Sequence, residues 1–495
     1  MSARQTSAQL AVLAVIAVGV VMRFVTASPL WLDEALSVHI AGGEEDLGDA
    51  LRRDGHPGLY YLLLGWWLQL FGEGDGAARA LSGLLGVATL PVLWGAARRH
   101  GRDVAVATVC LAASSPYLIR YSTEVRMYAL VVMTVALGWL AVERAWERPS
   151  AGRLGAVAVT TATLVHTHYW TFYVIAAGAV IVAWAGWRQR RVTPAMRIIG
   201  AAAAGAATFV FWLDVFFDQL RSTGTPWATR ARPTEVFIET LQGLGGNFRF
   251  EGETLGVVLA FFAVLGTFAV GMARHDTIEI RSSIARPAPV PAAAALLGLG
   301  LGAASAIVTG GAFEARYAAI ALPFLLLLAG RGIAVIGRRP RVVAGALIVS
   351  LGFAISIDEA RRTRSQGEEV AAAIDVMVEP QDVIVFCPDQ VGPATIRYLA
   401  ADNERRAFPS GDGRTVDWRD YLDRAGSLDP SAFALAASDA AGAGAVWFVS
   451  GVGYRGLDQP CGVLNGQLDA LRPRMLVVGL RELFEGMYAI RYGQP

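Results

Sequence analysis

The sequence predicts a polytopic α-helical membrane protein with about eleven spans and a small C-terminal α/β domain outside the membrane. Its 495 residues are 54% hydrophobic and only 17% charged, and the mean hydropathy is +0.44. One soluble core cannot enclose that much apolar surface, so lipid must surround most of the chain. The net charge is only +1, and no basic domain or aromatic-basic stripe supports nucleic-acid binding.

The predicted spans are mostly apolar runs, each close to the length of about 20 residues that crosses the hydrocarbon of a bilayer. The runs lie at 8–27, 77–97, 103–120, 127–145, 153–169, 171–187, 196–213, 254–273, 289–309, 317–337 and 341–357. Arginine clusters mark alternate connections: Arg98, Arg99, Arg102, Arg148, Arg153, Arg188, Arg190, Arg191, Arg274, Arg281, Arg338, Arg339 and Arg341. Positively charged connections stay in the cytoplasm, so we expect the N-terminus there too.

A further apolar stretch, LYYLLLGWWLQLF at 59–71, breaks this alternation if it crosses the membrane. It is short, carries Trp66 and Trp67, and is followed by GEGDG. These features favour an interfacial or re-entrant helix on the outer side. A twelfth span is the alternative.

The topology places four polar segments outside the cell: 28–56, 121–126, 214–252 and 310–316. The C-terminal part lies on the same side. Chemistry on the outer face of the cell membrane is therefore expected from these segments.

The chain divides by composition into a transmembrane module, 1–357, and an extracytoplasmic α/β domain, 358–495. In the second part VIVFCP, GAVWFVSG, MLVVGL and MYAIRY are typical of short buried strands, and GEEVAAAIDVMV and DQVGPATIRYLA are typical of helices. Cys110 lies in an apolar run, whereas Cys387 and Cys461 lie in the α/β domain. In an oxidising compartment these two either form a disulfide or remain free thiols, and the sequence leaves both open.

The first outer segment reads SPLWLDEALSVHI and places two adjacent carboxylates, Asp33 and Glu34, directly after an aromatic residue. One acid of such a pair can accept a proton while its neighbour orients it or binds a metal ion. Acidic residues are also ordinary in a solvated loop, so the pair alone does not identify a catalytic site.

Two other outer segments carry residues suited to a sugar phosphate. In HPGLYY, His56 can either cap the following helix or contact a phosphate, and Tyr60 follows it. At the head of the fourth span, Glu124, Arg126 and Tyr128 can either anchor the span in the interface or hold a sugar phosphate.

The later outer turns supply histidines, tyrosines and another arginine. In HTHY, His166 and His168 are separated by one residue and do not share a helix face, so they are a poor metal pair; Tyr169 follows them. Near the tenth span, Arg316 precedes Tyr317. Arginine suits phosphate because its planar fork binds two oxygens and keeps its charge.

These motifs, taken in order, resemble a known family. The series WLDEA, HPGLYYLLL, ARALSGLLGVATLPVLW, YSTEVRMYAL, HTHY and RYAAIALP looks like the protein-mannosyltransferase-like branch of the glycosyltransferase C (GT-C) superfamily, which includes the aminoarabinose transferases of lipid A. The resemblance covers about residues 8–340. It implies a GT-C type fold with juxtamembrane helices in the first loop, and a polyprenyl-phosphate-linked sugar as donor.

The resemblance also implies roles for single residues. Asp33 corresponds to the catalytic acidic residue, with Glu34 beside it, and Arg79 falls where the family commonly has an arginine. The family usually has His-Pro-Pro, followed in several members by a lysine, whereas here Gly58 follows Pro57 and the chain contains no lysine. The departure weakens a phosphate-binding role for 56–61 and favours Arg126 and Arg316.

The chemistry expected from this set is direct displacement at the anomeric carbon. Asp33 removes a proton from the acceptor hydroxyl, whose oxygen attacks the anomeric carbon as the bond to phosphate breaks. This direct displacement inverts the configuration of that carbon. Arg126 and Arg316 stabilise the leaving polyprenyl phosphate. A divalent metal held by Asp33, Glu34 or Glu124 is the alternative source of positive charge. The sugar is mannose-like or arabinose-like, and the acceptor is a glycan, lipid or protein of the cell envelope.

Two other classes of protein fit the composition. A multi-span transporter is the first, but no internal repeat appears, and the ionisable residues lie in loops and span ends rather than in mid-membrane. A scaffold or receptor is the second, but it leaves the grouping of Asp33, Glu124, Arg126 and Arg316 unexplained.

The topology predicts which positions a membrane-impermeant thiol reagent reaches in intact cells. Cysteines introduced at Glu45 and Asp420 should be labelled from outside, and one at Gln189 should not, because it lies in an arginine-rich connection. Labelling of position 189 together with protection of position 420 would reverse the orientation and exclude chemistry on the outer face.

Overall fold

A computed structural model describes residues 3–43, 45–223, 232–246, 250–272, 277–280, 289–309, 313–454 and 456–494. Arg274 and Arg281 of the predicted arginine clusters lie outside these residues. The chain forms two compact units. Unit 1 consists of Met1–Thr26, Arg79–Leu213 and Arg230–Ala360, and unit 2 of Ala27–Ala78, Asp214–Thr229 and Arg361–Pro495.

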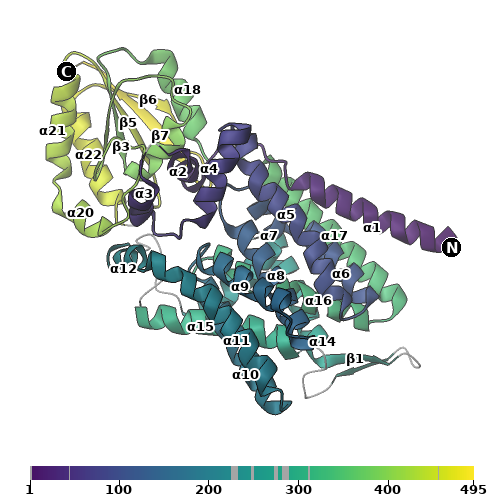
Figure 1. Cartoon of the computed structure of the whole chain (residues 1–495). Coiled ribbons are helices and arrows are strands. Elements are labelled where there is room, and N and C mark those ends of the chain that lie inside the picture. The colour runs from purple at the N-terminus through teal and green to yellow at the C-terminus, as the bar shows by residue number, and fades with distance from the viewer. Residues whose placement is uncertain are drawn as a thin grey trace. The chain divides into compact units, whose positions relative to one another are not determined.

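Unit 1 is built almost entirely of helices (Figure 1). Their bounds are α1 (Ala3–Met22), α5 (Asp75–Arg98), α6 (Arg102–Ser114), α7 (Pro116–Ser122), α8 (Tyr128–Glu147), α9 (Ala151–Val165), α10 (Thr171–Arg188), α11 (Val192–Ala207), η1 (Thr208–Trp212), α13 (Pro233–Gly245), α14 (Phe250–Phe268), α15 (Pro289–Thr309), η2 (Ala315–Ile320), α16 (Leu322–Val335) and α17 (Arg338–Arg361). A short antiparallel pair, β1 (Ala269–Met272) and β2 (Thr277–Ile280), follows α14.

The membrane character predicted from composition is confirmed. Within the described residues, 7 helices are long and apolar enough to cross a bilayer, or 8 if the bent pair α6 and α7 is one span. The remaining predicted runs fall on the shorter apolar helices α1, α9 and α16, so a total of eleven remains a prediction. The run predicted at 254–273 ends early as a helix, because Ala269–Met272 pairs as β1.

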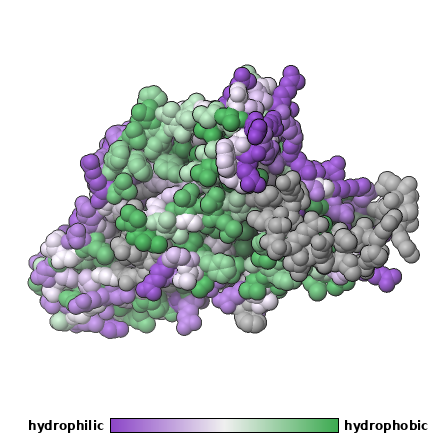
Figure 2. Space-filling view, turned by 90° about the horizontal axis from the view of Figure 1, so that it is seen from below, coloured by the Kyte–Doolittle hydropathy of each residue, from purple (hydrophilic) through white to green (hydrophobic). Residues whose placement is uncertain are grey.

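Large apolar side chains cover the outer surfaces of the unit 1 helices. Val159, Trp184, Leu296 and Leu347 are each more than half exposed in the isolated chain. Figure 2 shows one face of the molecule on which apolar residues form broad areas beside narrower hydrophilic ones. Surfaces of this kind are stable when they face lipid tails.

Arg23 and Arg331 are two of the buried arginines of unit 1, and both obtain partners from the backbone. Arg23 is fully buried and donates to the carbonyl oxygens of Gly19, at 2.6 Å, and Ala112, at 2.7 Å. Arg331 donates from Nε to the Gly266 carbonyl at 3.0 Å. Each buried cation therefore lies beside carbonyl dipoles, which a charge removed from water requires.

Unit 2 contains a five-stranded mixed sheet with the strand order β4-β3-β5-β7-β6. The strands are β3 (Val383–Cys387), β4 (Glu404–Ala407), β5 (Val446–Gly451), β6 (Arg474–Val478) and β7 (Met487–Tyr492). β3 pairs in parallel with β4 and β5, while β7 pairs antiparallel with β5 and β6. The small α/β domain predicted from the C-terminal sequence is thus confirmed.

Helices cover both faces of this sheet, as Figure 1 shows. Val383 and Val385 of β3 face the core that contains α21 (Pro430–Ala441) and α22 (Asp458–Leu471). Ile384 faces the opposite core, against α18 (Gly367–Met377) and α19 (Gly392–Ile396). The period of two places alternate residues on opposite faces, and both faces are buried, so β3 is apolar throughout.

The predicted elements of the domain agree with the structure except for one helix, and four further elements were not predicted. The predicted helix over DQVGPATIRYLA is broken into η3 (Asp389–Val391) and the short α19, because Pro393 starts a new turn. The sequence analysis missed β4, which is an exposed, charged edge strand. It also missed α21, α22 and α20 (Tyr421–Ser427).

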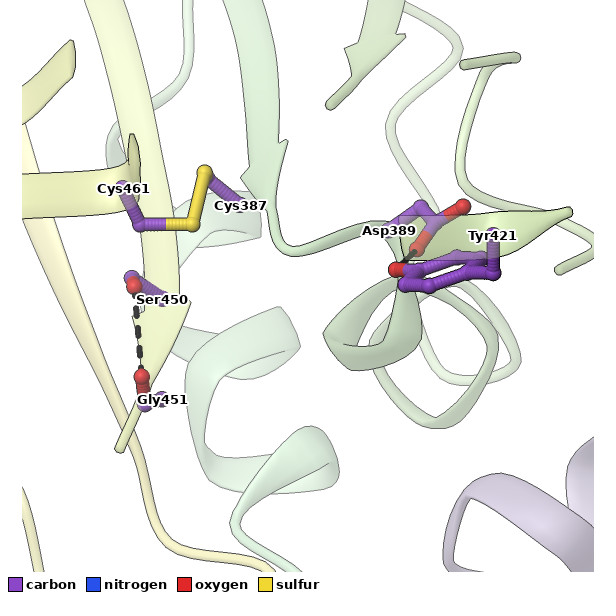
Figure 3. The surroundings of a disulfide bond; sticks show 6 residues. All are labelled: Cys387, Asp389, Tyr421, Ser450, Gly451 and Cys461. Carbon is purple, nitrogen blue, oxygen red and sulfur yellow. Dashed lines mark hydrogen bonds between the residues drawn. A yellow bond between two sulfur atoms is a disulfide. The ribbon is translucent and has the colours of Figure 1, made fainter. Parts of the chain in front are cut away.

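Cys387 and Cys461 form a disulfide that joins the end of β3 to α22 (Figure 3). Their Cα atoms are 5.5 Å apart, and the two cysteines are separated by 74 residues in the sequence. This settles the alternative that the sequence left open. Next to it, the buried carboxyl of Asp389 accepts the hydroxyl of Tyr421 (Figure 3).

Segments of 27–78 fold with the C-terminal residues 361–495 in unit 2. These are α2 (Leu32–Gly42), α3 (Leu47–Asp54) and α4 (Leu59–Phe71), joined by α12 (Leu213–Ser222) from the middle of the chain. Trp31, Leu32 and Leu36 lie in the same core as β3 and α22. The composition boundary at 357/358 lies close to the last crossing into unit 2, but unit 2 also contains 27–78 and 214–229.

Candidate functional site

The two acidic residues of the first loop lie in the first turn of α2, which belongs to unit 2. Glu34 is fully buried, and Asp33 is partly exposed. The Ser37 hydroxyl donates to the backbone carbonyl of Asp33 at 2.7 Å, which stabilises this turn. Asp33 is therefore the more accessible of the two carboxylates.

The residues directly before Asp33 contact the C-terminal domain. The Leu30 N–H donates to the Tyr398 hydroxyl at 2.6 Å, and Tyr398 in turn donates to Asp75 at 2.5 Å. The ring of Trp31 packs edge-on against Phe484, with 4.9 Å between ring centroids. The start of α2 is thus fixed within unit 2.

Glu485 continues this contact at the next residue. Its Oε1 accepts the Leu32 N–H at 3.1 Å, and the side chain is buried. The pKa of Glu485 is raised to about 8, mainly by burial. Hydrogen bonds from Ser365 and Leu32 oppose this rise, and the neighbouring carboxylates Asp33 and Glu34 add to it. At neutral pH this carboxyl is therefore mostly protonated.

His56 is held by a carboxylate that the sequence analysis did not single out. Asp54 lies 3.0 Å from His56 Nδ1 and accepts the Tyr61 hydroxyl at 2.6 Å. The amide of Gln219 donates to the backbone carbonyls of Leu51 and His56. Tyr60, beside Tyr61, is fully buried. A carboxylate on Nδ1 fixes the ring and leaves Nε2 as its second functional atom.

The second group of predicted residues belongs to unit 1 and surrounds the break between α7 and α8. Glu124 and Arg126 lie in this non-helical segment and are 1% and 3% exposed. Arg120 lies 3.4 Å from Glu124 and 3.4 Å from Glu359. Ser82 of α5 donates to the Arg126 carbonyl at 3.3 Å, and the buried Arg79 lies one turn earlier in α5.

A chain of aromatic rings runs beside this segment. In order the rings are Tyr117, Tyr121, Tyr128, His168, Tyr317 and Trp170, and neighbouring centroids lie 4.5 to 5.7 Å apart. The Tyr117 hydroxyl donates to the Arg316 carbonyl at 2.6 Å, which ties α7 to η2. Three predicted residues, Tyr128, His168 and Tyr317, are thereby brought into contact.

Single interactions define the remaining members of this group. His168 Nδ1 accepts the Trp170 N–H at 3.1 Å, so in the neutral ring Nε2 carries the proton. The Arg316 guanidinium lies 5.8 Å from the centroid of Tyr317. Tyr169 accepts from Trp212 Nε1 at 3.2 Å and packs on Phe172. Tyr169 therefore contacts a different group of side chains from His168.

The metal alternative has no cluster to support it among the described residues. In that part of the chain, no group of three or more His, Cys, Asp or Glu side chains lies close enough to hold a metal ion.

Comparison with known proteins identifies the fold. Residues 55–213 match the family model described as dolichyl-phosphate-mannose-protein mannosyltransferase. The structure is similar to that of ArnT from Cupriavidus metallidurans bound to undecaprenyl phosphate, with a TM-score of 0.60, 12% identity, and coverage of 99% of this chain and 98% of that one. The chain has the fold of the GT-C glycosyltransferase superfamily.

Two further solved structures resemble the chain to different degrees. The apo form of the same ArnT gives a TM-score of 0.60 at 14% identity, with 98% of each chain covered. An oligosaccharyltransferase from Archaeoglobus fulgidus gives a TM-score of 0.41 at 11% identity, covering 91% of this chain and 72% of that one. No curated protein matches the sequence. The fold implied by the resemblance to the glycosyltransferase C superfamily is confirmed, and the similarity to the ArnT structures extends over nearly the whole chain.

The family match includes most, but not all, of the predicted site. His56, Arg79, Glu124 and Arg126 lie inside the matched range, together with Tyr60, Tyr128, His168 and Tyr169. Asp33, Glu34, Arg316 and Tyr317 lie outside it. The roles of all these residues remain predictions.

Sequence reasoning missed several residues that contact the predicted site residues within each unit. Arg120 stands four residues before Glu124, a spacing at which helical ion pairs form, so it could have been found. The sequence around Asp54, Tyr398 and Glu485 gives no such signal, because only folding brings these residues close to the groups that they bind.

Glu485 predicts a specific dependence of stability on pH. The folded protein keeps this proton up to about pH 8, whereas the unfolded chain loses it near the ordinary pKa of 4.5. Folding therefore binds a proton in that window, and the free energy of unfolding falls as the pH rises through it. Glu485→Gln is neutral throughout, so its stability relative to wild type should rise between pH 5 and pH 8 by a few kcal/mol, at about 1.4 kcal/mol per pKa unit.

Thermal denaturation of the purified protein in detergent at pH 5, 6.5 and 8 measures this difference. Glu482→Gln, at an exposed position three residues earlier, is the matched control and should track the wild type. Parallel pH curves for Glu485→Gln and wild type would contradict the assigned protonation.

Proposed function

We propose that this protein is a membrane glycosyltransferase that transfers a sugar from a polyprenyl phosphate to an acceptor of the cell envelope. The observation that carries the proposal is the partly exposed Asp33 in the fixed first turn of α2, within a chain of GT-C fold. The related ArnT structure binds undecaprenyl phosphate, which supports a lipid of that class as the donor's carrier. Mannose-like and arabinose-like sugars both suit the proposal.

Asp33 is the proposed general base. An acceptor hydroxyl is a poor nucleophile, so a carboxylate near it removes the proton as the carbon of the sugar is attacked. Glu34 is buried in the same turn and suits a role in orienting its neighbour. Attack from the face opposite the phosphate inverts the anomeric carbon.

Arg126 and Arg316 are the proposed partners of the donor phosphate. Arg126 is almost fully buried, and removal from water strengthens its attraction for the charge that develops on the leaving phosphate. Arg316 lies next to the aromatic chain that contains Tyr128, His168 and Tyr317. Aromatic rings beside a cation suit a sugar phosphate, because sugar rings pack on apolar faces while the phosphate takes the charge.

An extracytoplasmic location of Asp33 is part of the proposal. Unit 2 contains both Asp33 and the Cys387–Cys461 disulfide. Disulfides persist in oxidising compartments outside the cytoplasm, which supports the outer side of the cell membrane for this unit.

Replacement of Asp33 tests the catalytic assignment. Asp33→Asn keeps the size of the side chain and removes its charge, so turnover should fall about 10²–10⁴-fold, the range for a positioned acid or base. The assay uses purified protein with undecaprenyl-phosphate-mannose and undecaprenyl-phosphate-arabinose in turn, cell-envelope extract as acceptor, and mass spectrometry of the products.

Asp49→Asn, at an exposed position on α3 of the same loop, is the control and should keep wild-type turnover. Glu34→Gln should reduce turnover less than Asp33→Asn if Glu34 only orients its neighbour. Normal sugar transfer by a folded Asp33→Asn protein would refute the assignment, and chelator sensitivity of the wild type would reopen the metal alternative.

The phosphate assignment predicts that Arg126→Ala and Arg316→Ala weaken use of the donor more than they weaken folding. Loss of a hydrogen bond to a charged group costs about 1.5–3 kcal/mol, or roughly 10- to 150-fold in kcat/KM for the donor. Arg338→Ala, at an exposed position at the start of α17, should leave donor use unchanged. If both site variants retain wild-type kcat/KM, the two arginines do not bind the phosphate.

A further inference from the structure

Three consecutive residues lead into Asp33, and each contacts a different residue of the C-terminal domain. Leu30 donates to Tyr398, Trp31 packs on Phe484, and Leu32 donates to Glu485. The partners lie more than 360 residues away in sequence. All six residues belong to unit 2, so these contacts lie within one compact body.

The first turn of α2 has no side-chain cap of its own. Its N-cap residue is Trp31, whose side chain makes no capping hydrogen bond. The first amides of a helix lack partners inside the helix, and a side-chain oxygen usually satisfies them. Here Glu485 Oε1 accepts the Leu32 N–H, the first amide of α2, and therefore serves as a cap from a distant part of the chain.

Glu485 is itself rigidly placed. Its backbone N–H donates to the Arg364 carbonyl at 2.8 Å, and its carbonyl accepts the Gln366 N–H at 3.1 Å. The Arg364 N–H donates to the Ser28 hydroxyl at 2.9 Å, and Ser28 lies just before α2 in the sequence. The cap is therefore supported by backbone hydrogen bonds on both of its sides.

We propose that Glu485 is a positioning residue for the transfer reaction, because it fixes the helical turn from which Asp33 extends. This inference rests on the proposed role of Asp33 as the base. It assigns to the C-terminal domain a part in catalysis through the geometry of α2, without contact between Glu485 and the substrate.

The chemistry of a base makes such positioning effective. A displacement of a reacting group by about 1 Å can cost roughly 100-fold in rate. The buried Glu485 carboxyl is protonated at neutral pH, so glutamine, which offers a carbonyl oxygen of the same reach, should replace it. Alanine removes the acceptor and leaves the first amide of α2 without its partner.

The experiment compares Glu485→Ala, Glu485→Gln and the exposed control Glu482→Ala in the full-length protein. Hydrogen exchange read by mass spectrometry measures the protection of residues 30–43, and this readout does not depend on catalysis. Turnover is measured with undecaprenyl-phosphate-mannose and undecaprenyl-phosphate-arabinose in turn. We expect Glu485→Ala to speed exchange in α2 and to lower kcat by about 10- to 100-fold with little change in the donor KM. Glu485→Gln should restore both, and Glu482→Ala should resemble wild type.

Two results would overturn the inference. One is unchanged exchange in 30–43 for Glu485→Ala, which would mean that the cap does not hold the turn. The other is faster exchange with wild-type kcat, which would make Glu485 a purely structural residue. A fully active Asp33→Asn protein would instead refute the proposed base, whatever the exchange data for Glu485 show.

Discussion

The hydrocarbon core of a bilayer offers no hydrogen-bond partners, and the organisation of unit 1 follows from this constraint. Every buried backbone group must be satisfied within the protein, which favours helices. The same demand applies to side chains. Arg23 and Arg331 are tolerated because carbonyl oxygens of Gly19, Ala112 and Gly266 surround them. We therefore expect polar side chains with a functional role to lie at the ends of helices.

The break between α7 and α8 is such a place. Glu124 and Arg126 lie in a non-helical segment, where their side chains can turn away from the apolar helix faces. Arg120 and Ser82 satisfy part of this segment, and the aromatic chain from Tyr117 to Trp170 packs beside it. The proposed phosphate-binding role of Arg126 draws on this arrangement, since a buried cation beside a rigid apolar wall needs little reorganisation to bind an anion.

Sequence reasoning succeeded where a local pattern carries the information. Apolar runs predicted the helices because span length is set by bilayer thickness, and the strands at Val383 and Val446 were found because both of their faces are buried. The edge strand at Glu404 was missed, since charged edge residues prevent aggregation and conceal the strand signal. Asp54 and Glu485 were missed for another reason. Each is important only through a partner that folding brings near, and a single sequence does not indicate such contacts.

Unit 2 is built from segments that lie far apart in the sequence, and this has a consequence for biogenesis. Strand β7, at Met487–Tyr492, lies between β5 and β6, so the sheet cannot close before β7 has been made. At about 5–20 residues per second, the segment 27–78 waits on the order of tens of seconds for its partners. During that interval Trp31 and Leu32 lack their partners Phe484 and Glu485. The newly inserted protein thus depends on residues 484–492 to complete the packing of the much earlier segment 27–78.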